Sequence, residues 1–295
     1  MKRIFLFLAT NIAVMVTLGI VANVLCALMG TTVEQLIGPE YANLAIFAFV
    51  YGIVGAFVSL LLSKPMAKFA CRAQTIDGTE GEAERWLVAT VEDLARRANV
   101  KMPEVAIYPG AANAFATGAF RNHALVAVST DIMGQMSKEE LRAVLGHEMS
   151  HVANGDMVTL TLVQGVLNAF VIFFSRVLAS ILSNAGRGQG SRRSSGGTYF
   201  LLVMVFDICL GILASLVVFA FSRRREYAAD AGSARLLGTP MPMIAALRRL
   251  GNLQPGVLPD SLKAFGIAEG KRTSLWATHP SLEDRIAALQ SLGPA

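Results

Sequence analysis

Four long apolar runs dominate the hydrophobic pattern of this chain. A helix rises about 1.5 Å per residue and a bilayer core is about 30 Å thick, so each run is long enough to cross a membrane. The predicted transmembrane helices are residues 4–29, 44–62, 158–182 and 200–221. The first run follows Lys2 and Arg3, but it exceeds the apolar stretch of about 7–15 residues that a signal peptide carries. We therefore interpret it as an uncleaved membrane anchor.

The stretch between the second and third runs has the pattern of a soluble α+β domain. Residues 82–98 carry apolar side chains at helical spacing, which predicts an amphipathic helix. Short apolar runs at residues 105–108, 114–117 and 124–128 are bounded by glycine and asparagine, as strands usually are. We therefore expect a small sheet beside the helices.

A second helix in this domain is predicted from its capping residues. Ser137 with Glu140 three residues later forms a capping box, and the helix should end near Asn154 and Gly155. After the fourth apolar run the chain looks mainly helical, and prolines are expected to break it. These prolines are Pro240, Pro242 and Pro255.

The pattern divides the chain into two membrane hairpins and one soluble domain in two pieces. The parts are an N-terminal hairpin at residues 1–62, the first piece of the domain at 63–157, a second hairpin at 158–221 and the second piece at 222–295. The second hairpin is thus inserted into the soluble domain.

Composition agrees with a membrane protein. Hydrophobic residues make up 54% of the 295 residues and charged residues 16%, compared with about 25% charged residues in soluble domains. The net charge of +5 could suggest nucleic acid as a partner, but the basic residues lie beside the apolar runs, where membrane topology explains them. We therefore expect no nucleic-acid partner. The spacing of the three cysteines does not match a disulfide framework, and it does not match a thiolate metal site.

The basic residues predict the orientation of the chain in the membrane. They follow the second run at Lys64, Lys68 and Arg72 and the fourth run at Arg223, Arg224 and Arg225. Residues 30–41 hold no lysine or arginine. Since cytoplasmic loops carry the excess of lysine and arginine, both termini and residues 63–157 are expected in the cytosol. Residues 183–199, expected to form a flexible outer loop, disagree with this rule because they hold three arginines.

A candidate metal-binding motif lies inside the capped helix. In His147-Glu148-Met149-Ser150-His151 the two histidines are four residues apart and share one helix face, so both imidazoles reach a single ion. Glu148 lies between them, where it can hydrogen-bond a water on that ion, as in the HExxH zinc proteases. The alternative is a helix with two incidental exposed histidines.

A catalytic zinc site needs a third protein ligand and an open position. No histidine follows His151 at short spacing, and the strongest candidate for this ligand is Glu226. Asp230 is four residues further on and would accept an N–H from a ligating imidazole. The alternative is that Glu226 pairs with the neighbouring arginines. Two membrane crossings separate residues 151 and 226, and an even number of crossings returns both residues to one face.

Several segments beyond the histidine motif are distinctive. The motif runs on to Asn154-Gly155-Asp156, and the others are Asn113-Ala114-Phe115-Ala116-Thr117-Gly118, Glu226-Tyr227-Ala228-Ala229-Asp230 and Thr278-His279-Pro280-Ser281-Leu282-Glu283-Asp284-Arg285-Ile286. Together, over essentially the whole chain, they resemble the HtpX-type membrane metalloproteases. The resemblance implies a gluzincin protease of a bacterial inner membrane, with a cytosolic active site and a role in membrane-protein quality control. The expected fold is a multi-pass α-helical membrane protein with an α+β zincin-like cytosolic metalloprotease domain, mostly helical with a small sheet.

The expected reaction is hydrolysis of peptide bonds in protein or peptide substrates, membrane proteins among them, with one zinc ion per chain as cofactor. Zinc lowers the pKa of a bound water to about 7 and polarises the scissile carbonyl. Glu148 takes the proton of the water and passes it to the leaving amine. The lipid bilayer is the other expected partner.

Three further residues are candidates for contact with the substrate. Asn113 and Ala114 open a strand, up to residue 117, that could pair with an extended substrate by strand addition. An ordinary core hairpin is the alternative, and the family resemblance favours substrate binding. His279 could donate a hydrogen bond to the transition state. Its alternative role is to cap a helix that begins after Pro280.

Two charged residues, Arg176 and Asp207, lie inside the third and fourth predicted transmembrane helices. Charges inside a membrane are usually functional or paired. Both lie roughly 10 Å from the outer ends of their helices at about 1.5 Å per residue, so we expect an ion pair that locks this hairpin. The alternative is that Arg176 extends alone toward the outer surface.

Other classes of protein fit the sequence less well. An intramembrane-cleaving protease would place the motif inside an apolar run, but the residues around it are polar. A prenyl-protein protease would need a larger helical chamber than four transmembrane helices suggest. A non-catalytic scaffold or transporter with a structural zinc site would need four protein ligands, and the sequence offers three besides Glu148.

Overall fold

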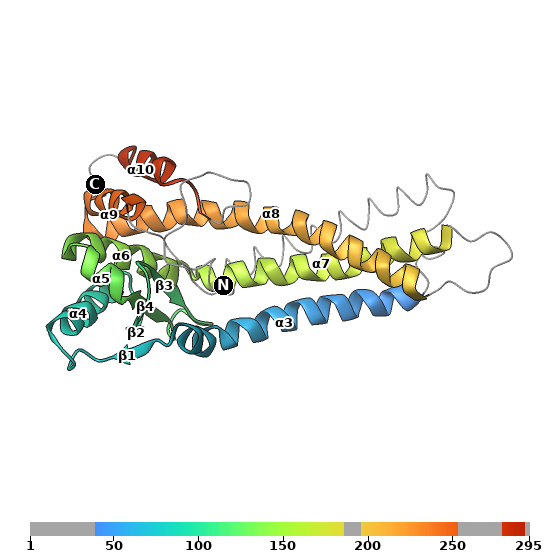
Figure 1. The fold of residues 1–295 in the computed structure, drawn as a ribbon, viewed down its shortest axis with the longest axis horizontal. Coiled ribbons are helices and arrows are strands. Elements are labelled where there is room, and N and C mark those ends of the chain that lie inside the picture. The colour runs from blue at the N-terminus through green and yellow to red at the C-terminus, as the bar shows by residue number, and fades with distance from the viewer. Residues whose placement is uncertain (1–38, 186–195, 253–278, 293–295) are drawn as a thin grey trace. The chain divides into compact units, whose positions relative to one another are not determined.

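The computed structural model describes residues 39–185, 196–252 and 279–292 (Figure 1). The predicted transmembrane helix at 4–29, most of the 183–199 loop and the break expected at Pro255 lie outside the described residues. The chain divides into two compact units. Unit 1 consists of Met1–Gly55 and Gln164–Ala214, and unit 2 of Ala56–Val163 and Ser215–Ala295.

Within the described residues, three helices are long and apolar enough to cross a membrane. These helices are α3 (Pro39–Cys71), α7 (Asp156–Ala185) and α8 (Gly196–Leu237). They contain the predicted transmembrane segments 44–62, 158–182 and 200–221, which are therefore confirmed as long apolar helices. Because α8 is unbroken over 42 residues, no loop separates the fourth predicted transmembrane segment from Glu226.

The helix that contains the second predicted transmembrane segment, 44–62, is longer than that segment. The helix α3 continues through Pro65 to Cys71. Proline removes one helical hydrogen bond, but the turns that follow it are held by packing. Ala67 and Cys71 are buried in an apolar cluster with Tyr108. Tertiary contacts thus extend the helix beyond the point where its sequence suggests a break.

Two charged residues meet within unit 1. Arg176 on α7 and Asp207 on α8 lie with Nη1 and Oδ1 3.5 Å apart. Ser175 donates a hydrogen bond to the Asp207 carboxylate, and Arg176 Nη1 donates to the carbonyl oxygen of Ile172 at 2.9 Å. The two charges are therefore in contact, and the expected locking of the two helices stays a prediction.

Neutralising Arg176 or Asp207 singly, as Arg176→Gln or Asp207→Asn, is expected to destabilise the protein more than the double change does. A single change leaves one charge without its partner in apolar surroundings, whereas the double change removes both charges. We expect each single variant to lose about 1–2 kcal/mol of unfolding free energy, the size of interhelical polar contacts. Chemical unfolding in detergent measures these losses. If the losses of the two single variants add up in the double variant, the ion pair does not stabilise the protein.

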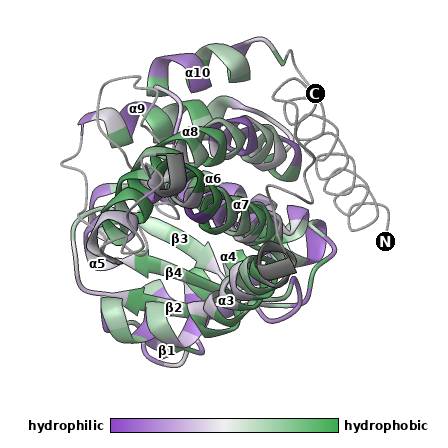
Figure 2. Ribbon diagram, turned by 90° about the vertical axis from the view of Figure 1, so that its right-hand side faces the viewer, coloured by the Kyte–Doolittle hydropathy of each residue, from purple (hydrophilic) through white to green (hydrophobic). Residues whose placement is uncertain are grey.

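Unit 2 contains a four-stranded mixed sheet in the order β1-β2-β4-β3. The strands are β1 (Gln74–Ile76), β2 (Glu104–Tyr108), β3 (Ala114–Thr117) and β4 (Leu125–Ser129). Strands β2 and β4 are parallel, and the other two pairs are antiparallel. The three predicted strands are confirmed, whereas β1 was missed because three largely exposed residues leave no apolar pattern. Figure 2 shows the hydrophobic colours of the central strands, which are covered on both faces.

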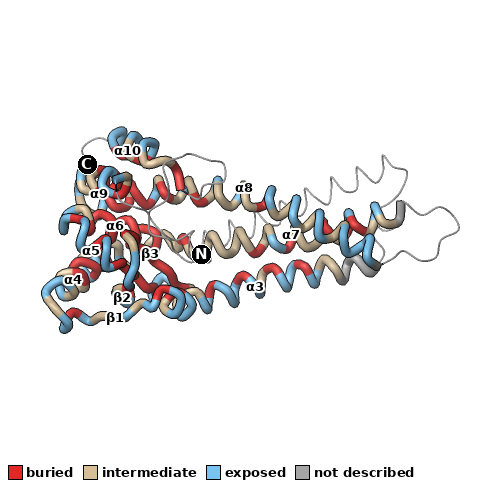
Figure 3. Tube along the Cα trace, in the orientation of Figure 1, coloured by how far each residue is buried: buried red, intermediate tan, exposed pale blue. Residues whose placement is uncertain are grey.

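Five further helices lie in the described part of unit 2. They are α4 (Glu82–Arg97), α5 (Thr130–Gln135), α6 (Lys138–Asn154), α9 (Met241–Asn252) and α10 (Leu282–Gln290). The helix α6 packs against α4, α9 and the strands β3 and β4. Figure 3 shows that α6 is buried along most of its length. A helix this deeply enclosed can hold polar side chains in a fixed geometry.

The ends of α6 follow the sequence prediction. Ser137 accepts a hydrogen bond from the backbone N–H of Glu140, and the Glu140 side chain accepts one from the backbone N–H of Ser137. The helix ends at Gly155, whose φ of 66° is left-handed and suits glycine. The predicted break at Pro240 is confirmed by the end of α8 at Leu237, but Pro242 lies in the first turn of α9 and does not break it. Proline is tolerated in a first turn because its missing N–H has no helical partner there.

Candidate metal centre

The two histidines of α6 face one point inside unit 2. They are one helical turn apart, and 1% of His147 and 8% of His151 are exposed. Their ring planes are nearly perpendicular, with centroids 4.6 Å apart. The Nε2 atoms of the two rings lie 3.1 Å from each other. The alternative of two incidental exposed histidines is therefore wrong.

Small residues bring α8 close to α6. A β-carbon at Gly146 would meet Ser233 Oγ at 2.8 Å, so glycine leaves the room that α8 needs. Ser233 Oγ in turn donates a hydrogen bond to the carbonyl oxygen of Ala143 at 2.7 Å. This close approach brings the part of α8 that carries Glu226 and Asp230 to the histidines.

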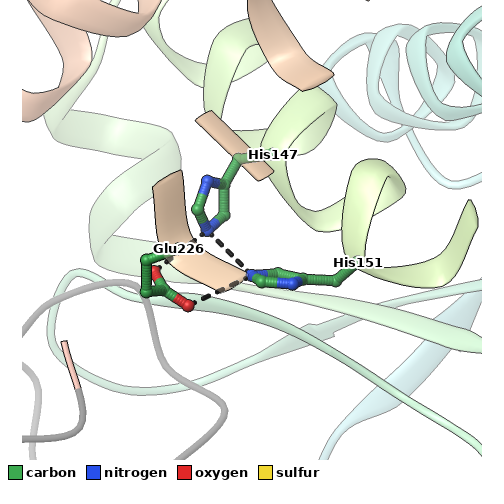
Figure 4. Close-up of side chains that lie close together, drawn as sticks. All are labelled: His147, His151 and Glu226. Carbon is green, nitrogen blue, oxygen red and sulfur yellow. Dashed lines mark hydrogen bonds and ion pairs between the residues drawn. The ribbon is translucent and has the colours of Figure 1, made fainter. Parts of the chain in front are cut away.

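The carboxylate of Glu226 completes a group of three possible ligands (Figure 4). Its Oε2 lies 3.4 Å from His147 Nε2, and its Oε1 lies 3.3 Å from His151 Nε2. One ligand atom from each residue lies within 4.8 Å of the other two. Among the described residues, this is the group of histidine, cysteine and acidic side chains arranged to hold a metal ion.

Hydrogen bonding fixes which nitrogen of each imidazole faces this centre. His147 Nδ1 lies 2.8 Å from Asp230 Oδ1, and His151 Nδ1 lies 2.7 Å from Asp156 Oδ2. Because a carboxylate accepts, each Nδ1 carries a proton and each Nε2 of the neutral ring presents a lone pair. Two lone pairs and a carboxylate this close together repel one another unless a cation lies between them. The donor set therefore fits a metal ion.

The buried charges around the centre also favour a divalent cation. Four carboxylates and two guanidinium groups surround it: Glu148, Asp156, Glu226 and Asp230 against Arg225 and Arg285. With neutral imidazoles, four negative and two positive charges leave minus two, which a divalent cation cancels. Burial alone lowers the pKa of His147, but its hydrogen bonds to the carboxylates of Asp230 and Glu226 raise that pKa on balance. The centre thus attracts positive charge.

Asp230 lies where the sequence predicted it, against a candidate ligand, whereas two other residues were missed. Asp156 accepts a hydrogen bond from His151 Nδ1, just as Asp230 accepts one from His147 Nδ1. Its signal is the Asn154-Gly155-Asp156 run, in which a left-handed glycine turns the chain back toward the histidine. Arg285 is fully buried, and sequence gives no sign of this because arginine is usually exposed.

Arg285 is bound on both sides by acidic groups. Its Nε and Nη2 donate to the two oxygens of Asp230 at 2.8 and 2.7 Å, and its Nη1 lies 3.4 Å from Glu226 Oε2. Burial alone lowers the pKa of Arg285, but the carboxylates of Asp230 and Glu226 outweigh it and raise that pKa above its ordinary value. The guanidinium therefore stays charged inside unit 2.

Glu148 lies beside the candidate ligands without being one of them. It is 1% exposed, and its Oε2 has no hydrogen-bond partner among the described residues. Burial raises the pKa of Glu148, whereas the backbone N–H of Ala116 on β3 favours its charged form. A buried carboxylate with a free oxygen and a raised pKa has the properties of a general base.

The structure also places the three residues considered for substrate contact. His279 Nδ1 lies 2.9 Å from Glu226 Oε2, beside the possible ligands. The helix α10 is capped by Ser281, which accepts from the N–H of Asp284, so the capping role considered for His279 is wrong. Asn113 and Ala114 are buried at the start of β3, which is an edge strand of the sheet.

Comparison with known proteins identifies the family. The model of a family described as "Peptidase family M48" matches residues 82–292. The chain is 52% identical to a "Protease HtpX homolog" of Verminephrobacter eiseniae (strain EF01-2), with 99% of each chain covered. It is 50% identical to a relative of the same description from Janthinobacterium sp. (strain Marseille), covering 99% of this chain and 100% of that one.

A solved structure supports the fold. The crystal structure of S. mikatae Ste24p matches 83% of this chain with a TM-score of 0.53 at 19% identity, and the match spans 56% of the Ste24p chain. At this identity the likeness concerns the fold alone. The predicted resemblance is confirmed by the near full-length matches to curated relatives. The chain therefore belongs to peptidase family M48 and is a membrane metalloprotease of the HtpX type.

Proposed function

We propose that this protein is a zinc-dependent endopeptidase of the bacterial inner membrane that hydrolyses membrane or misfolded proteins at a cytosolic active site, in protein quality control. The observation that carries the proposal is the meeting of His147, His151 and Glu226 beside Glu148, whose Oε2 has no hydrogen-bond partner among the described residues. A closed structural site would need four protein ligands. The group among the described residues offers three, which favours an open, catalytic site.

Each residue of the centre has a proposed role. His147, His151 and Glu226 hold one zinc ion per chain, which supplies a Lewis acid and a readily ionised water when bound. Glu148 accepts the proton of the attacking water and passes it to the leaving amine. Asp230 keeps the Nδ1 proton on His147, so that Nε2 remains a ligand.

The edge of β3 is the proposed binding site for an extended substrate. Ser129 on β4 donates its backbone N–H to the Asn113 carbonyl at 2.9 Å. Since backbone groups alternate along an antiparallel pair, those of Ala114 and Ala116 point away from β4. There the Ala114 N–H donates to Asn113 Oδ1 at 2.8 Å and the Ala116 N–H binds the Glu148 carboxylate. A substrate strand would pair with the carbonyl oxygens on this side and would replace these N–H contacts. His279 is proposed to stabilise the negative charge that develops on the scissile carbonyl oxygen.

The active site is proposed to lie in the cytosol. Basic residues in the last turns of α3, just after it, and in α8 support this orientation by the positive-inside rule. Lys64 and Lys68 form ion pairs with Glu104 of unit 2 at 2.6 and 2.5 Å, which supports a position for them outside the bilayer. Cysteines introduced at exposed positions 138 and 248 should react with a membrane-impermeant thiol reagent only after the inner membrane is permeabilised. Labelling of these cysteines from the periplasmic side of an intact inner membrane would contradict the orientation.

Zinc content and cleavage together test the proposed function. The purified full-length protein in detergent is expected to contain one zinc ion per chain and to cleave casein. Removing zinc with a chelator should abolish cleavage, and adding zinc back should restore it, because the attacking water and the carbonyl are both activated at the metal. Unchanged cleavage after complete removal of zinc would contradict the proposal, and so would a preparation that binds no zinc.

A further inference from the structure

Each imidazole of the centre is backed by an aspartate, and each aspartate by an arginine. In the first chain of contacts, Asp230 Oδ1 meets His147 Nδ1 at 2.8 Å, and Arg285 holds both carboxylate oxygens of Asp230. A fork that binds both oxygens fixes the plane of a carboxylate, which one hydrogen bond leaves free to rotate. Arg285 therefore determines which way Asp230 faces.

The second chain of contacts runs through Asp156. Its Oδ2 lies 2.7 Å from His151 Nδ1 and 3.2 Å from Arg225 Nη2. Arg225 Nη1 also donates to the backbone carbonyl of Asp156. Arg225 on α8 thus fixes both the main chain and the carboxylate of the first residue of α7. Its hold on the carboxylate is weaker than that of Arg285, because it reaches one oxygen instead of two.

The positive charge of these two arginines by itself opposes the binding of a cation. A positive charge close to a metal ion repels the ion and weakens its binding. Arg285 comes near the candidate ligands themselves, with its Nη1 3.4 Å from Glu226 Oε2. Two guanidinium groups beside a cation site are therefore explained only if they contribute something that outweighs their repulsion.

We propose that Arg285 and Arg225 are positioning residues that set the metal affinity of the centre by fixing the aspartates that orient His147 and His151. This inference rests on the proposed zinc site. Without its arginine, an aspartate can rotate away from Nδ1, and the imidazole loses its fixed orientation and part of its basicity. The metal then binds more weakly, although a repelling positive charge has been removed.

The test measures zinc affinity in variants of the purified full-length protein. Arg285→Gln, Arg285→Lys, Arg225→Gln and the control Arg248→Gln are compared by competition with a zinc chelator. The control is exposed on α9 and has no described contact with the centre. We expect affinity to fall about 10–100-fold for Arg285→Gln, as for other partners of ligating groups. We expect a smaller fall for Arg225→Gln and none for the control.

Two further measurements separate positioning from a structural role. Arg285→Lys keeps the charge but cannot bind both oxygens, so it should fold and still bind zinc more weakly than the wild type. A stabilising role alone would lower the unfolding temperature equally with and without zinc. Positioning predicts that the increase in unfolding temperature produced by zinc becomes smaller. If Arg285→Gln does not fold, the zinc affinities of Arg285→Lys and Arg225→Gln decide the question.

A double variant tests whether Arg285 acts through Asp230. Combining Arg285→Gln with Asp230→Asn should weaken zinc binding no more than Asp230→Asn does alone. Additive losses would overturn the proposal, and so would zinc affinity in the arginine variants equal to or tighter than that of the wild type. A wild-type protein that binds no zinc would instead overturn the proposed metal site, so the two failures are distinguishable.

Discussion

Replacing Glu148 with glutamine is expected to slow casein cleavage about 10³-fold while zinc binding is retained. Glutamine has nearly the same shape, but it cannot accept the proton of the attacking water, and general-base catalysis typically contributes about 10²–10⁴-fold. Zinc should remain because Glu148 is not among the three candidate ligands. Metal analysis and cleavage assays on the same preparation measure both effects.

A matched control for this variant lies on the same helix. Glu139→Gln removes an exposed carboxylate of α6 and should leave cleavage and zinc content unchanged. If Glu148→Gln cleaves casein at the wild-type rate, another residue must accept the proton. If it loses its zinc, Glu148 acts as a ligand and the proposed division of roles is wrong.

Replacing Glu226 with alanine is expected to remove both zinc and activity. The two imidazoles then remain as the ligands, and the negative charge that balances the ion is lost. Mutating a residue that only hydrogen-bonds a metal ligand typically lowers metal affinity about 10–100-fold. We therefore expect loss of a ligand itself to lower zinc affinity by more than about 100-fold. Competition with a chelator measures this loss. Zinc binding at wild-type affinity would refute Glu226 as the third ligand.

The interpretation of this variant depends on a folded protein. Glu226 also contacts His279 and Arg285, so alanine leaves two buried groups with one partner fewer. Glu226→Gln keeps the volume and can still hydrogen-bond while removing the charge, and it should also lose zinc. Glu283→Ala, an exposed glutamate on α10, is the control that should retain wild-type zinc affinity.

Features that depend on residues close together along the chain were predictable from the amino-acid sequence. Apolar runs predicted α3, α7 and α8, because crossing a membrane requires about 20 consecutive apolar residues. Ser137 and Glu140 predicted the start of α6, because a capping box uses groups three residues apart. The spacing of His147 and His151 predicted that they face one point, because residues one turn apart share a helix face.

Contacts between polar groups that are far apart in the sequence became visible in the folded protein. Tertiary packing brings Arg285 to Asp230, and no spacing in the sequence indicates this contact. Packing also places His279 against Glu226, whereas Ser281 caps α10. The same holds for Pro65, where packing of the following turns keeps α3 helical. A local pattern gives the direction of a side chain along its own helix. The partner of a buried charge is set by whichever elements enclose it, and these come from remote parts of the chain.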